Sequence, residues 1–191
     1  SAKWARDVDR VDVVKFYGGY LLDSRVGQQG VNRMVDFLNR EGIAVAVELA
    51  PMTPTAGCGA GIQGYVGWQS GQHIARMIRD AGGEIHYLAL DGPMWWGSLY
   101  DGVRPEENPC HYTLEETAEN VRQTVENFRD IFPDMIVGDI HAWAPDLYSP
   151  EEIVAWWDAY EAAIGEPFGF FHLDPEYKLP GWPGVTAFLY A

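Results

Sequence analysis

The stretch Glu84-Ile85-His86-Tyr87-Leu88-Ala89-Leu90-Asp91-Gly92-Pro93 predicts a buried strand that ends in a carboxylate and a turn. Apolar residues fill most of it, and Gly92-Pro93 cannot continue a strand. Similar apolar runs recur along the chain. Strands are expected over residues 11–17, 43–49, 135–140 and 168–173, and residues 185–190 are the candidate for one more.

Helical periodicity fills the intervals between these runs. Thr113 with Glu116, and Ser149 with Glu152, match the capping-box pattern that closes the first turn of a helix. Glycine follows the first and the last of the helical segments, where a C-terminal cap belongs. Apolar residues recur every three or four positions over residues 31–40, 69–81, 113–132 and 149–164.

Strand and helix therefore alternate along the chain, and the strands are nearly continuous apolar runs. Such strands are buried on both faces, which implies a parallel sheet with right-handed helical crossovers. An open doubly wound sheet and a TIM-type (β/α) barrel both fit this α/β alternation. We favour the barrel because the long loops follow strands and because acids recur at the carboxyl ends of the strands.

The length of the chain sets a limit on this barrel. We expect a single domain over residues 1–191. A closed (β/α) barrel typically needs about 250 residues. The chain offers five to six β/α units, so we expect either a fragment of a barrel or an incomplete barrel whose open edges are covered.

The composition narrows the range of partners. The formal net charge is −15, whereas binding to nucleic acid or to an anionic membrane needs clustered Lys and Arg, so we expect neither. No apolar run approaches the roughly 18 residues of a transmembrane helix. Eight tryptophans indicate either an aromatic core or flat surfaces for sugar rings. We expect an oligo- or polysaccharide as partner, and a homo-oligomer stays open.

Residues two apart in a strand share a face, so each expected strand offers one face with polar groups near its carboxyl end. If these faces point into the barrel, the polar groups converge at one mouth. Asp139 is the expected exception, since barrel strands often use an acid to tie down a neighbouring loop. The converging residues would be Lys15, Glu48, Asp91, Asp139, His141, His172 and Asp174.

Paired carboxylates beside aromatic residues suit glycoside hydrolysis. One acid, its pKa raised by apolar neighbours, protonates the leaving oxygen, and the other attacks or activates water. Asp91 is the expected proton donor, and its partner is Asp174, Glu176 or Glu48. The expected substrate-binding residues are Lys15, Tyr17, Trp95, Trp96, Trp143 and His172.

Two alternatives to the hydrolase stay open. Asp139, His141 and His172 mix carboxylate and imidazole, which suits a divalent metal, as in a metal-dependent sugar isomerase or epimerase. The chain has no HExxH motif and no paired CxxC motif, so the first expectation is that no cofactor is needed. The second alternative is a non-catalytic carbohydrate-binding protein that uses its tryptophans as platforms.

The long segment after the second expected strand contains a GxGxxG match at residues 59–64. We discount a dinucleotide site, because prolines and several further residues separate the match from the strand. A flexible lid over the mouth is the better interpretation. Cys58 and Cys110 lie in the loops after neighbouring strands, where they could form a disulfide or remain two thiols. A disulfide would indicate an oxidising compartment, hence a secreted or periplasmic protein.

Four motifs resemble uncharacterised bacterial proteins of the glycoside-hydrolase-like (β/α)8 barrel superfamily. The resemblance covers residues 11–176 and implies the barrel fold, without implying one activity. Members are long enough for a whole barrel, and in them an acid often follows Gly-Asp-Ile, where this chain has His141. The motifs are residues 81–93, Cys110-His111-Tyr112-Thr113, Phe132-Pro133-Asp134 and Gly138-Asp139-Ile140.

Overall fold

The structure, a computed structural model, describes residues 8–143 and 149–175 of the chain. Strands and helices alternate as the sequence predicts, whereas the candidate strand over residues 185–190 lies outside the described residues. The elements are η1 (Val8–Arg10), β1 (Val13–Tyr17), α2 (Gly18–Leu21), α3 (Gly27–Glu41), β2 (Ala44–Leu49), α4 (Trp68–Asp80), β3 (Tyr87–Asp91), η2 (Trp95–Leu99), α5 (Leu114–Arg129), β4 (Ile136–Trp143), α6 (Pro150–Ile164) and β5 (Phe170–Pro175).

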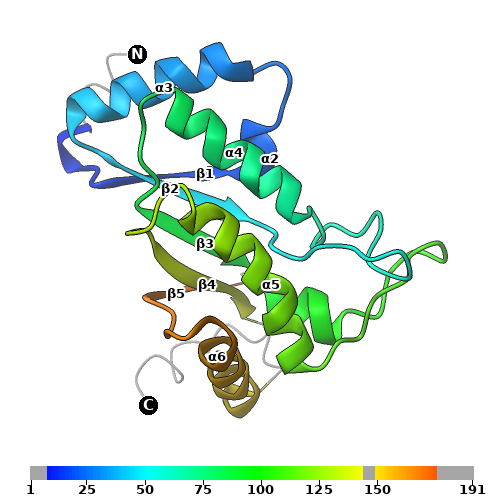
Figure 1. Cartoon of the computed structure of the whole chain (residues 1–191). Helices are drawn as coiled ribbons and strands as arrows, with labels where there is room; N and C mark the ends of the chain where they lie inside the picture. The colour runs from blue at the N-terminus through cyan, green and yellow to red at the C-terminus, as the bar shows by residue number, and fades with distance from the viewer. Residues whose placement is uncertain (1–7, 144–148, 176–191) are drawn as a thin grey trace.

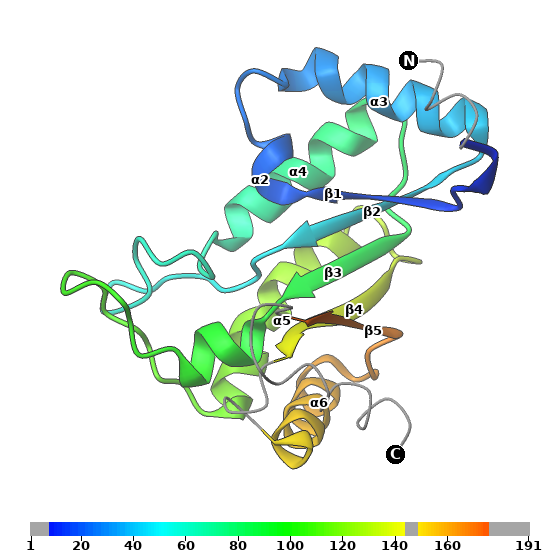
Figure 2. The same ribbon diagram turned by 180° about the vertical axis from the view of Figure 1, so that it is seen from behind.

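The five strands form one parallel sheet in the order β1-β2-β3-β4-β5. The sheet curls into a half-barrel, and the helices α3 to α6 lie along its outer face (Figures 1 and 2). Each strand therefore returns beside its predecessor through a helix, as parallel pairing requires. The expected (β/α) barrel is confirmed as a partial one, with β1 and β5 as the two edges of the described sheet.

The capping residues expected from the sequence begin and end the helices in the structure. Both capping boxes are formed, at Thr113 before α5 and at Ser149 before α6. Gly42 after α3 and Gly165 after α6 adopt left-handed backbone angles, with φ of 67° and 89°. That conformation is strained for residues with a Cβ atom, which explains glycine at both positions.

The hydrophobic core fills the space between the outer face of the sheet and the helices. Val47 and Leu88 of the sheet are fully buried, as are Ile74 of α4 and Val125 and Phe128 of α5. Their helical spacing places one apolar stripe of each helix against the strands. No described helix has both the length and the apolar character that a membrane crossing requires.

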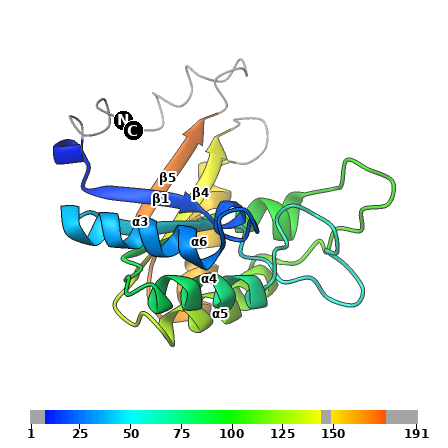
Figure 3. The same ribbon diagram turned by 90° about the horizontal axis from the view of Figure 1, so that it is seen from above.

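The strand register decides which side chains share the inner, concave face. Lys15 pairs with Ala46 across β1 and β2, and Asp91 pairs with Ile140 across β3 and β4. Ile140 in turn pairs with His172 on β5. Seen from above, the segments after β2 and β3 project together beyond the carboxyl ends of the strands (Figure 3). These two segments therefore form one side of the mouth of the half-barrel, next to β2 and β3.

Candidate active site at the mouth of the half-barrel

A charged cluster joins the two edges of the half-barrel at its concave face. Lys15 on β1 forms an ion pair with Glu48 on β2. The Lys15 ammonium also lies 3.1 Å from Nδ1 of His172 on β5, 157 residues away. The strand periodicity that places Lys15, Glu48 and His172 on one face therefore brings them together in space, as the sequence predicts.

Asp91, at the carboxyl end of β3, is the carboxylate with the strongest perturbation in this cluster. Its pKa is raised to about 6, chiefly by burial and then by the negative charges of Glu48 and Asp174, while the positive charge of Lys15 acts in the opposite direction. Desolvation and like charge both disfavour the ionised form of a carboxyl group. Asp91 can therefore carry a proton near neutral pH beside other carboxylates.

The raised pKa of Asp91 has a consequence for stability. In the unfolded chain the group titrates near 3.8, and in the folded chain it titrates near 6. The folded state thus favours the protonated form, so the contribution is complete below pH 4 and is lost as the pH rises through 6. Asp91→Asn, which mimics the neutral acid, is expected to raise the free energy of unfolding by about 1–3 kcal/mol at pH 7.5 and to change it little at pH 4.

Denaturant unfolding at the two pH values measures this effect. Asp101→Asn is the matched control, because the Asp101 side chain is 91% exposed. It should change stability by less than about 0.5 kcal/mol at either pH. If Asp91→Asn is no more stable than the native chain at pH 7.5, the ionised Asp91 does not destabilise the folded state.

The other predicted site residues lie at different places around the mouth. Tyr17 is level with Glu48 in the register and is 44% exposed. Asp174 is exposed near the end of β5, and its charge reaches Asp91. The side chain of Trp143 and the whole of Glu176 lie outside the described residues.

Trp95 and Trp96 do not lie in an irregular loop, because they begin the helical turn η2, which three residues separate from the end of β3. Both rings are half-buried and pack against Tyr100, with ring centroids 6.1 Å apart for Trp95 and 4.9 Å apart for Trp96. A Cβ atom at Gly64 would lie only 2.0 Å from the Trp96 ring. Trp96 is thus held against the glycine-rich segment, and its role toward a sugar stays a prediction.

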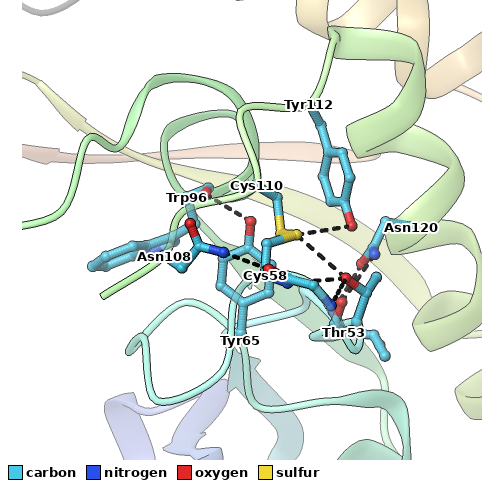
Figure 4. The surroundings of a disulfide bond; sticks show 10 residues. Thr53, Cys58, Tyr65, Trp96, Asn108, Cys110, Tyr112 and Asn120 are labelled. Atoms are coloured by element: carbon cyan, nitrogen blue, oxygen red, sulfur yellow. Dashed lines mark hydrogen bonds between the residues drawn. A yellow bond between two sulfur atoms is a disulfide. The ribbon is translucent and has the colours of Figure 1, made fainter. Parts of the chain in front are cut away.

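The wall of the mouth is a pair of loops joined by the disulfide Cys58–Cys110 (Figure 4). Asn108 strengthens the junction, since its side chain donates to the Gly57 carbonyl and its carbonyl accepts from the Gly59 N–H at 2.8 Å. The Tyr65 hydroxyl donates to the Trp96 carbonyl at 3.1 Å. The segment was expected to be a flexible lid, but these bonds tie it to the loop that follows β3.

A further pair of bonds anchors this wall to helix α5. The Asn120 side chain accepts from the Thr53 N–H at 2.8 Å and donates to the Thr53 carbonyl at 3.0 Å (Figure 4). Sequence reasoning missed Thr53, Tyr65, Asn108 and Asn120. Each partner lies far away along the chain, so no local pattern in the sequence could have found these bonds.

The face expected for the fourth strand is wrong. Oδ2 of Asp139 accepts hydrogen bonds from the indole N–H groups of Trp156 at 3.1 Å and Trp157 at 2.9 Å, both on α6. The same oxygen lies 2.6 Å from Nε2 of His141, and both side chains are fully buried. Asp139 therefore faces the helical layer, where it binds helix α6 instead of the expected neighbouring loop, and His141 lies there with it.

The alternative metal set is consequently divided between two faces of the sheet. Asp139 and His141 lie under α6, whereas His172 lies on the concave face beside Lys15. Within residues 8–143 and 149–175, no three His, Cys, Asp or Glu side chains lie close enough together to share a metal ion.

No protein-family model and no curated protein sequence matches the chain. Its fold resembles that of solved enzymes. A D-psicose 3-epimerase, solved in the presence of D-fructose, aligns with a TM-score of 0.54 and 10% identity over 91% of this chain and 57% of that chain. An L-ribulose 3-epimerase aligns with a TM-score of 0.51 and 17% identity, over 88% and 51%. The fold is a partial TIM barrel.

A third similar structure is a β-glucosidase from Thermotoga maritima in complex with glucoimidazole, with a TM-score of 0.43, 16% identity, and coverage of 90% of this chain and 53% of that chain. The chain thus spans about half the length of the TIM-barrel enzymes that it resembles. At this level of identity the resemblance concerns the fold, and the chemistry has to be argued from the residues at the mouth.

Proposed function

We propose that the chain is a carbohydrate-active enzyme of the glycoside hydrolase class. The observation that carries the proposal is Asp91, a carboxyl group with a pKa of about 6 at the carboxyl end of a barrel strand, within the field of Glu48 and Asp174. In TIM barrels the carboxyl ends of the strands carry the catalytic groups. Most glycoside hydrolases use two carboxyl groups in different environments, one as the acid and the other as the nucleophile or base.

In this proposal Asp91 donates its proton to the glycosidic oxygen as the bond from that oxygen to the anomeric carbon breaks. Glu48, ion-paired with Lys15, supplies the carboxylate that faces the positive charge developing on the sugar. Water completes the reaction by adding its hydroxyl to the anomeric carbon, and its remaining proton restores the acid. Trp95 and Trp96 lie just beyond Asp91 and would contact the sugar ring.

Release of reducing ends from a panel of oligo- and polysaccharides tests the hydrolase. Asp91→Asn is expected to lower the rate at least a hundredfold, because general acid catalysis contributes roughly 10²- to 10⁴-fold. Asp101→Asn, on an exposed loop, should retain the native rate. Cleavage that continues unchanged in Asp91→Asn would remove this residue from the mechanism and with it the proposal.

One observation favours a second candidate, a sugar epimerase or isomerase. Asp91 lies in the field of the Lys15 ammonium, so a carboxylate that accepts a proton next to a carbonyl would have a cation nearby for the developing enolate oxygen. Two similar structures with a TM-score above 0.5 are sugar 3-epimerases. Solvent deuterium entering D-fructose or L-ribulose, detected by NMR with and without added Mn²⁺, would identify this activity.

The disulfide supports a location outside the cytoplasm. Cys58 and Cys110 are joined in the structure, and disulfides persist mainly in oxidising compartments. We therefore propose a secreted or periplasmic protein that acts on an oligo- or polysaccharide. Labelling the native chain with a thiol reagent after isolation under non-reducing conditions checks the state of both cysteines.

A further inference from the structure

Lys15 has an unusual position in the half-barrel. It projects from the edge strand β1, yet its ammonium contacts Glu48 on the neighbouring strand and approaches His172 on the opposite edge strand β5. It is the single lysine in residues 8–143 and 149–175. One cation thus links three strands at the level of the candidate acids.

The contacts of Lys15 distinguish the carboxylates around it. Its ammonium forms a direct ion pair with Glu48, whereas its effect on Asp91 is a longer-range electrostatic interaction. The charges that act on Asp91 are those of Glu48 on β2, Lys15 on β1 and Asp174 on β5. His172 of β5 lies on the same face, two strands away in the register. On the adjoining strand β4 the neighbour of Asp91 in the register is the apolar Ile140.

We propose that Lys15, held across the mouth by His172, is a positioning residue that fixes Glu48 as the charged partner and leaves Asp91 as the group that carries the proton. The inference rests on the proposed hydrolase and deepens it. A cation that pairs with one acid of a dyad lowers the tendency of that acid to protonate, so the proton goes to the other acid. The division of roles then follows from where Lys15 lies.

Lys15→Met removes the charge while keeping much of the length of the side chain. Asp91 loses a nearby cation that lowers its pKa, so the limb of the pH–activity profile that reports Asp91 should move upward. The turnover number should fall, because Glu48 is no longer held. Lys15→Arg keeps the cation and should keep the native profile. A purely structural role for Lys15 would lower the amount of folded protein without moving the profile.

A measurement that needs no turnover separates this inference from the proposed function. The side-chain carboxyl of Asp91 is followed by ¹³C NMR in the full chain, and its signal is assigned by its loss in Asp91→Asn. Its titration midpoint should rise in Lys15→Met and, by a smaller amount, in His172→Gln, where Lys15 loses its second contact. Arg76→Met, which removes an exposed charge on α4, should leave the midpoint unchanged.

The outcomes are distinct. A midpoint that stays in place in Lys15→Met overturns the inference, whatever the enzyme cleaves. A midpoint that rises in a chain that cleaves no glycoside supports the control of Asp91 by Lys15 and contradicts the hydrolase alone. If Lys15→Met does not fold by circular dichroism, Lys15→Gln and His172→Gln carry the same test, and a midpoint unchanged in both overturns it.

Discussion

Replacing Asp139 with alanine is expected to lower the free energy of unfolding by about 3–5 kcal/mol. The substitution removes the acceptor for two indole N–H groups and the partner of His141 in a fully buried site. Each buried donor left without an acceptor costs about 1–3 kcal/mol. Because Trp156 and Trp157 of α6 both donate to this carboxylate, the helix should lose these hydrogen bonds to β4 and keep its packing contacts with the sheet.

Thermal and denaturant unfolding measure this loss. In a chain of this length, 1 kcal/mol corresponds to about 2–4 °C in Tm, so a decrease of roughly 10 °C is expected. Asp139→Asn retains one carbonyl oxygen as an acceptor and should be less damaging. Asp134→Ala, an exposed position shortly before the same strand, should change stability by less than about 0.5 kcal/mol. A loss below about 1 kcal/mol for Asp139→Ala would show that the buried network contributes little.

Removing the disulfide is the second large change. Cys58 and Cys110 are 52 residues apart, and a cross-link that closes a loop of this size stabilises by about 4 kcal/mol, because it restricts the unfolded chain. The double variant Cys58→Ser/Cys110→Ser should therefore unfold at a denaturant concentration well below that of the native chain. The hydrogen bonds of Asn108 and Tyr65 would then hold the wall of the mouth without the covalent link.

Reductant provides the internal control for this prediction. Dithiothreitol should lower the stability of the native chain to that of the double variant and should leave the double variant unchanged. Mass spectrometry should first show that the reductant has freed both thiols. If the unfolding curve of the native chain is then unchanged, the disulfide does not stabilise the fold. The single variants Cys58→Ser and Cys110→Ser should behave like the double variant in either condition.

Much of the candidate site followed from the periodicity of single strands. Alternation places Lys15, Glu48, Asp91 and His172 on one face each, and parallel strands bring those faces to a common mouth. The structure adds the ion pair of Lys15 with Glu48 and the approach of Lys15 to His172. It also assigns the raised pKa to Asp91, because burial and neighbouring charge depend on the whole assembly.

The fourth strand shows where periodicity fails. A strand buried on both faces does not alternate between apolar and polar residues, so either face of β4 could have been the inner one. Asp139 lies on the outer face because its hydrogen-bond donors, the indole N–H groups of Trp156 and Trp157, lie there on a helix that begins several residues after the strand. The glycines of residues 59–64 are explained in the same way, since Gly64 lies against the ring of Trp96.

The sequence by itself determined the alternation of strands and helices, the caps at Gly42, Thr113, Ser149 and Gly165, and the face of four of the five strands. These features depend on residues within a few positions of one another, so local patterns contain them. Only the tertiary structure decided the orientation of Asp139, the tie between the two loops, and which acid is buried. Those depend on side chains that approach across strands and helices, and their partners are set by packing rather than by spacing along the chain.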